Sequence, residues 1–117
     1  MIAASFLGRI GGIETYLPLL KALSHQAPMV RHNALNALGY LGQSNLAINA
    51  VEKILNNPSE ELFVKHSAIQ LIQEVRFMHM EDKAIKILEF YINNDTTPGN
   101  MKGLAERGIR TLNASRY

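Results

Sequence analysis

The chain of 117 residues contains no cysteine, which excludes disulfide bonds, thiolate metal sites and cysteine nucleophiles. The chain also lacks a large excess of positive or negative charge. Its formal net charge is only +2, which is too small to indicate by itself a nucleic acid or an anionic membrane as partner. Long apolar runs are missing as well. The apolar opening segment reaches Arg9 almost at once, so it is too short for a signal peptide or a membrane span. We therefore expect a cytoplasmic protein without membrane contact.

A repeated segment is the main feature that the chain does contain. Residues 30–34, Val-Arg-His-Asn-Ala, recur 34 positions later at 64–68 as Val-Lys-His-Ser-Ala. Each copy leads into apolar residues at spacings of three and four, which place them on one face of a helix. Four such apolar sets occur: Ala3, Phe6, Leu7 and Ile10; Ala34, Ala37, Leu38 and Leu41; Ala68, Leu71, Ile72 and Val75; and Ala105, Gly108, Ile109 and Leu112. A period of 31 to 37 residues is typical of stacked repeats.

A second amphipathic stretch lies between successive sets, so each period predicts an antiparallel pair of helices. Gly42 predicts a helix end, Pro28 a first helical turn and Ser59 a helix N-cap. First helices are expected near 13–24, 45–56 and 81–93, and second helices near 28–42, 61–75 and 99–113. The chain is then one domain, 1–117, with repeats at about 1–12 (partial), 13–43, 44–76 and 77–114.

The segment from Val30 to Gly42 carries a family resemblance. Its pattern Val-Arg-x-x-Ala-x-x-Ala-Leu-Gly-x-Leu-Gly resembles the second helix of a HEAT repeat, and the short period is similar to the subtype named after the phycobilisome lyases. The resemblance implies an all-α, right-handed α-solenoid of about three and a half helix pairs, with about seven helices. HEAT repeats often carry an acid four or six residues before the arginine. Here only Glu61, before Lys65, fits, so we expect an incomplete ladder of charges.

Histidines and carboxylates give no predicted catalytic or metal site. His32 and His66 hold equivalent positions on second helices that would lie about 8–10 Å apart, whereas zinc ligands lie about 2 Å from one ion. Glu60-Glu61 and Glu81-Asp82 fall at expected helix starts, where acids offset the helix dipole. We therefore expect surface histidines, no cofactor, no metal and no enzymatic activity.

The helix face opposite the apolar sets is the expected binding surface. Turning about 100° per residue from Ala34, residues such as His32 and Asn36 point away from the core. Leu35 and Ile69 flank this face, either as apolar anchors for a partner or as packing between repeats. The candidate binding residues are His32, Asn36, Tyr40, Gln43, His66, Gln70, Gln73, Arg107 and Arg110. In HEAT-like stacks the second helices line the concave side, which solenoids use for binding, so we predict a non-catalytic protein–protein interaction or scaffold module.

Two alternatives to a scaffold stay open: an accessory subunit of a lyase-type enzyme and a nucleic-acid-binding HEAT-like protein. The last sixteen residues have a net charge of +3, from Lys102, Arg107, Arg110 and Arg116 against Glu106. A nucleic-acid footprint would spread a basic stripe over several repeats. The expected partner is therefore a protein of unknown identity rather than a nucleic acid.

Ala3, Phe6, Leu7 and Ile10 are candidates for self-association. The chain opens directly with a second-type helix, so no first helix of the same pair covers this row, and an apolar edge is expected to stay exposed. Three explanations fit an exposed apolar edge here: truncation of a longer solenoid, a partner protein bound at this end, or pairing of two copies of the chain. For a stand-alone chain these four apolar residues predict a symmetric homodimer, because two-fold pairing buries the same patch on both subunits.

Overall fold

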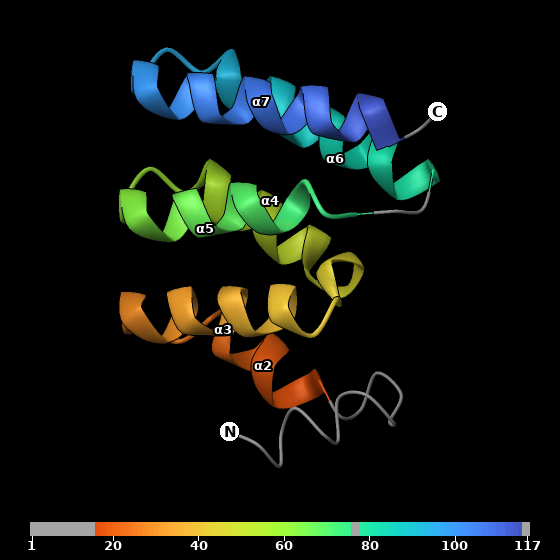
Figure 1. The fold of residues 1–117 in the computed structure, drawn as a ribbon. Helices are drawn as coiled ribbons and strands as arrows, with labels where there is room; N and C mark the ends of the chain where they lie inside the picture. Colours follow the sequence, from red (N-terminus) through yellow and green to blue (C-terminus); the bar gives the residue numbers. More distant parts are fainter. Residues whose placement is uncertain (1–15, 76–77, 116–117) are drawn as a thin grey trace.

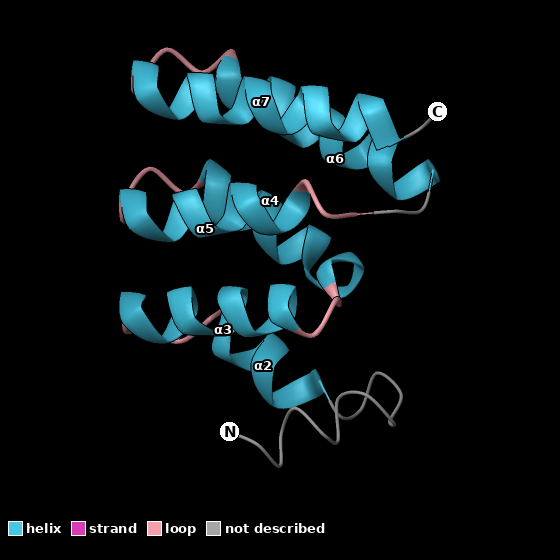
Figure 2. Cartoon of the chain, in the orientation of Figure 1, coloured by secondary structure: helices cyan, strands magenta, loops and turns pink. Residues whose placement is uncertain are grey.

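The computed structural model describes residues 16–75 and 78–115, and within these ranges helices joined by turns and loops are the only regular secondary structure (Figure 2). No helix in these ranges is long and apolar enough to cross a membrane. The expected helix near 1–12, with Ala3, Phe6, Leu7 and Ile10, lies outside the described residues. The helices are α2 (Leu17–Ala22), α3 (Pro28–Tyr40), the 3-10 helix η2 (Ser44–Ala47), α4 (Ile48–Asn56), α5 (Leu62–Ile72), α6 (Met78–Ile92) and α7 (Gly99–Ser115). The all-α prediction is confirmed for this part of the chain.

The α-helices form three successive pairs, α2 with α3, α4 with α5 and α6 with α7. Across the pairs, α3 packs against α5, α5 against α7, and α4 against α6. Figure 1 shows α3, α5 and α7 one above another and running in the same direction. The extents of 41 × 36 × 17 Å agree with two layers of helices, because packed helices lie about 8–10 Å apart. One layer holds α3, α5 and α7, and the other holds α2, α4 and α6.

Pro28 and Gly42 mark helix boundaries as predicted, and Ser59 does not. Pro28 begins α3, where its missing N–H removes no helical hydrogen bond. Gly42 follows α3 with a φ of +71°, a conformation that is free of strain only without a Cβ. The N-cap prediction for Ser59 is wrong: the N-cap of α5 is Glu61. The Ser59 N–H instead donates to Oδ1 of Asn57 at 2.9 Å, so the asparagine forms the turn before α5.

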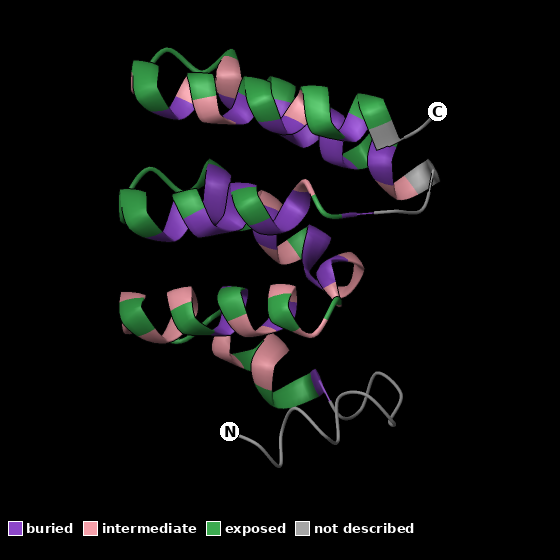
Figure 3. Ribbon diagram, viewed as in Figure 1, coloured by how far each residue is buried: buried purple, intermediate pink, exposed green. Residues whose placement is uncertain are grey.

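The apolar sets of the sequence form the core between the two layers. Leu38 is 0% exposed and Ile72 is 1% exposed, which confirms their predicted burial. Val51 and Leu88 from the other layer belong to the same buried cluster. Most residues of α5 are buried, whereas those of the short helix α2 are half-buried or exposed, as Figure 3 shows. The core is therefore centred on the middle and last helix pairs.

Leu35 and Ile69 are packing residues and not anchors for a partner. Both side chains are fully buried, Leu35 on α3 and Ile69 on α5, two helices that pack against each other. Fully buried side chains cannot contact a partner without rearrangement of the core. The two roles that the sequence left open for these residues are thus decided in favour of packing.

Leu38→Ala should lower the free energy of unfolding by about 2–5 kcal/mol, because it leaves a cavity in a closely packed core. Tyr40→Ala, two residues away on the same helix, should change it by less than about 0.5 kcal/mol, since Tyr40 is 76% exposed. Urea unfolding followed by circular dichroism measures both values. Equal losses for the two variants would contradict the assignment of buried and exposed faces.

Candidate functional site

The candidate binding residues lie on α3, α5 and α7 and just after the ends of α3 and α5. We call this set the second-helix surface. Its exposed members are Asn36, Tyr40, His66, Gln70, Arg107 and Arg110, and its half-buried members are His32, Gln43 and Gln73. Six of the nine side chains are therefore open to a partner, and these six line two hollows.

The first hollow, of about 220 Å³, lies between α3 and α5. Asn36 and Tyr40 line it from α3, and Gln70 lines it from α5. Ser67, Leu71 and Glu74 complete much of its wall. Apart from the Glu74 carboxylate, its polar lining is uncharged. This α3–α5 hollow can offer amide and hydroxyl groups for hydrogen bonds and an aromatic ring for apolar contact.

The second hollow, of about 560 Å³, lies between α5 and α7. His66 lines it from α5, and Arg107 and Arg110 line it from α7 together with Glu106 and Leu104. The structure thus brings three predicted residues from two helices into one hollow. Planar guanidinium groups favour carboxylate and phosphate groups as partners. This α5–α7 hollow is the positively charged part of the second-helix surface.

His32 occupies a different environment from His66, although the sequence predicted one shared environment. Nδ1 of His32 lies 2.7 Å from Oγ of Ser67, and its ring meets that of Phe63 edge-on, with centroids 5.4 Å apart. Nε2 lies 3.2 Å from Nδ2 of Asn36. The sequence placed His32 on the helix face that points away from the core, whereas in the structure its side chain is half-buried and contacts α5. It joins α3 to α5, because the neighbouring helix comes within reach of an imidazole ring.

Gln43 and Gln73 are half-buried. Gln43 follows α3, and its N–H donates to the carbonyl of Leu38 at 2.9 Å. Gln73 is the C-cap of α5. Its side chain lies against Gly108 of α7, because Oε1 is 3.5 Å from the position that a Cβ atom on this glycine would occupy. Gln73 thus reaches across to α7. Both glutamines are less available to a partner than the exposed residues of the set.

An ion pair between the first and second helix pairs is the main feature that the sequence pattern missed. Nε and Nη2 of Arg31 donate to the two carboxylate oxygens of Glu60 at 2.7 and 2.6 Å. The exposed fractions of the two side chains are 15% and 2%. The hydrogen bond with Glu60 raises the pKa of Arg31 above its ordinary value. The sequence pattern placed the acid four or six residues before the basic residue of its own repeat. Glu60 lies five residues before Lys65 and pairs instead with Arg31 of the preceding helix pair.

Lys65, the equivalent of Arg31 in the next repeat, contacts the third helix pair. Its Nζ lies 5.5 Å from the centroid of the Tyr91 ring on α6, within the range of a cation–π interaction. Burial lowers the pKa of Lys65, and burial raises the pKa of Tyr91. The Oη atom of Tyr91 is buried and has no hydrogen-bond partner among the described residues. The equivalent basic positions thus connect each of the first two helix pairs to the pair that follows.

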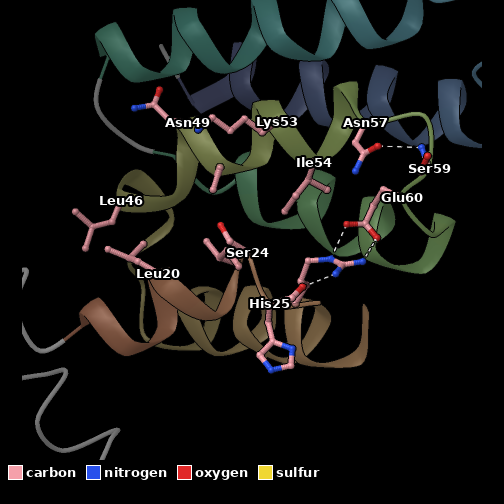
Figure 4. Close-up of a pocket in the computed structure, with 13 residues that line it drawn as sticks. Leu20, Ser24, His25, Leu46, Asn49, Lys53, Ile54, Asn57, Ser59 and Glu60 are labelled. Carbon is pink, nitrogen blue, oxygen red and sulfur yellow. Dashed lines mark hydrogen bonds and ion pairs between the residues drawn. The ribbon is translucent and has the colours of Figure 1, made fainter. Parts of the chain in front are cut away.

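A third hollow opens on the other layer, between α2 and α4, with a volume of about 630 Å³. Figure 4 shows Leu20 and Leu46 at one end of it and Glu60 at the other. The Arg31 guanidinium and Lys53 also line it. The Arg31 and Glu60 groups of this α2–α4 hollow are already paired with each other, and Ser24, Asn49 and Lys53 supply further polar lining.

The described residues contain no group of three histidine, aspartate or glutamate side chains that could hold a metal ion. Comparison with known proteins gave no relative: no protein-family model, curated protein or solved structure matched the chain. The chemistry available on the second-helix surface is hydrogen bonding, aromatic contact and charge pairing. Such a surface is suited to binding.

Glu60→Gln should lower the free energy of unfolding by roughly 1–3 kcal/mol, because it leaves the Arg31 guanidinium without its charged partner. The neighbouring change Glu61→Gln, at an exposed residue whose side chain makes no capping hydrogen bond, should cost less than about 0.5 kcal/mol. Thermal and urea unfolding of both variants at neutral pH provides the comparison. A Glu60 variant as stable as the Glu61 variant would show that the ion pair does not hold the helix pairs together.

Proposed function

We propose that this chain is a short HEAT-like module whose helix pairs stack as a right-handed α-solenoid. Two sets of equivalent positions, the alanines of the apolar sets and the basic residues near the starts of the second helices, support the proposal. Ala34, Ala68 and Ala105 are all buried, and Arg31 and Lys65 each contact the next helix pair. Repeats that contact only their neighbours are the defining feature of solenoid proteins.

The function that we infer for the module is non-catalytic binding of a protein partner through the second-helix surface. The arrangement of its two hollows supports this function most directly. Gln70 lines the α3–α5 hollow and His66 lines the α5–α7 hollow, and residues four apart are neighbours on a helix. The hollows are therefore adjacent on α5. The exposed ring of Tyr40 at one end is the kind of side chain that is enriched in protein interfaces.

The enzyme-subunit and nucleic-acid alternatives have less support in the geometry. Arg107 and Arg110 are the observation that favours nucleic acid, yet both lie on α7. The corresponding exposed residues of α3 and α5, Asn36 and Gln70, are uncharged, and Glu74 lines the α3–α5 hollow. A polyanion that followed the second helices would meet a positive charge at one end only. Protein binding is thus the preferred proposal.

Combining Asn36→Glu, Tyr40→Ala and Gln70→Glu should remove partner capture while leaving the fold intact, because all three residues are exposed and line the α3–α5 hollow. The assay is affinity capture from the source cell, with quantitative mass spectrometry. Proteins captured by the unmodified chain should fall by about tenfold or more, since a few central residues dominate an interface.

The matched control combines Lys53→Gln, Lys86→Gln and Phe90→Ala in the opposite layer, all at exposed residues. It changes the net charge by the same amount and also removes one exposed aromatic ring. Capture should survive in this control. A loss of capture in the control with full capture by the α3–α5 variant would place the interface on α4 and α6 and defeat the proposal.

A further inference from the structure

Two arginine side chains on α7 form an unpaired positive site within the α5–α7 hollow. Arg107 and Arg110 are exposed and three residues apart, so they are neighbours on the helix surface. Neither forms an ion pair with any residue in the described ranges. The hollow contains a single carboxylate, that of Glu106. Its lining therefore has two arginines against one acid.

We propose that the α5–α7 hollow binds the carboxylates of a short acidic segment of a partner protein. This inference rests on the proposed function and names the chemistry of its partner. Arginine binds carboxylates through paired N–H groups, and His66 and Asn100 line the same hollow with further polar groups. Leu104 is half-buried there and offers apolar contact beside the charges.

The arrangement of the two hollows gives the bound segment a direction. Its acidic residues lie over Arg107 and Arg110, while the uncharged remainder crosses α5 between His66 and Gln70 and reaches Tyr40 on α3. Two helix-to-helix steps of about 8–10 Å each make a path of roughly 16–20 Å. An extended peptide rises about 3.3 Å per residue, so about five to seven residues span this path.

The distribution of charge favours an acidic peptide over a nucleic acid. Glu74 stands in the α3–α5 hollow, where it would repel a phosphate backbone that continued along the surface. A peptide can place its carboxylates at the α7 end alone and uncharged residues beside Glu74. The second-helix surface is thus complementary to a segment whose negative charge is confined to one end.

The test is a titration of the full chain, labelled with nitrogen-15, followed by NMR. The probe is a capped peptide of about seven residues with two adjacent glutamates and one leucine in a glycine–serine background. Shift changes should gather at His66, Asn100, Arg107 and Arg110. Arg107→Gln combined with Arg110→Gln should raise the Kd by about tenfold or more, and added salt should weaken binding to the unmodified chain.

Lys86→Gln combined with Lys102→Gln is the matched control, because it removes the same charge and neither lysine lines the hollow. This control should bind the peptide as the unmodified chain does. Equal weakening by both double variants, equal binding of a peptide with glutamines in place of glutamates, or an absence of shifts at the hollow would each overturn the proposal. Tighter binding of a single-stranded oligonucleotide at the same residues would overturn it in favour of a nucleic acid.

The result can be separated from that of the proposed function. If the α3–α5 variant loses its captured proteins but no acidic peptide binds at Arg107 and Arg110, protein binding stands and the acidic class of partner is wrong. If capture is unaffected by the α3–α5 variant, the proposed function itself fails, whatever the peptide does.

Discussion

Close contact of α3 with α5 and of α5 with α7 determines the rest of the surface. Leu35 and Ile69 are fully buried in this layer. A Cβ on Gly108 would stand 3.1 Å from Cδ1 of Leu88 and 3.7 Å from Cγ2 of Ile69, so the glycine lets α7 approach α6 and α5 together. Because Ala34, Ala68 and Ala105 are buried at equivalent positions, the residues two places further along each helix are exposed on a common side. The proposed binding surface is thus a consequence of how the helices pack.

Polar contacts at the starts of the second helices add specificity to this apolar packing. The Glu60 carboxylate accepts from Arg31 and from the Glu61 N–H at 2.9 Å, so one side chain joins two helix pairs and the beginning of α5. Lys65 makes the corresponding connection through the Tyr91 ring. An ion pair needs both partners in place, whereas apolar packing tolerates exchange of similar side chains. These contacts therefore favour one alignment of neighbouring pairs.

Residues whose placement depends on helical periodicity could be predicted from the sequence, and residues whose placement depends on the distance between helices could not. Spacings of three and four identified Leu38 and Ile72 as core residues, and the paired helices of residues 16–75 and 78–115 followed from the same pattern. His32 shows the limit: its outward direction on an isolated helix was clear, but its contacts with Ser67 and Phe63 depend on how near α5 lies. Glu60 was missed because its partner, Arg31, is 29 residues away. The proposed dimer through Phe6 and its neighbours stays a prediction.

Spin labels can test directly whether α3, α5 and α7 stack in register to form one surface. The chain has no native cysteine, so Asn36→Cys and Arg107→Cys place labels at equivalent positions on α3 and α7 without background labelling. Electron–electron double resonance should give one narrow distance distribution, with the two backbones roughly 16–20 Å apart once the reach of the labels is allowed for. A broad distribution, or a distance far longer than two helix spacings, would contradict a continuous second-helix surface.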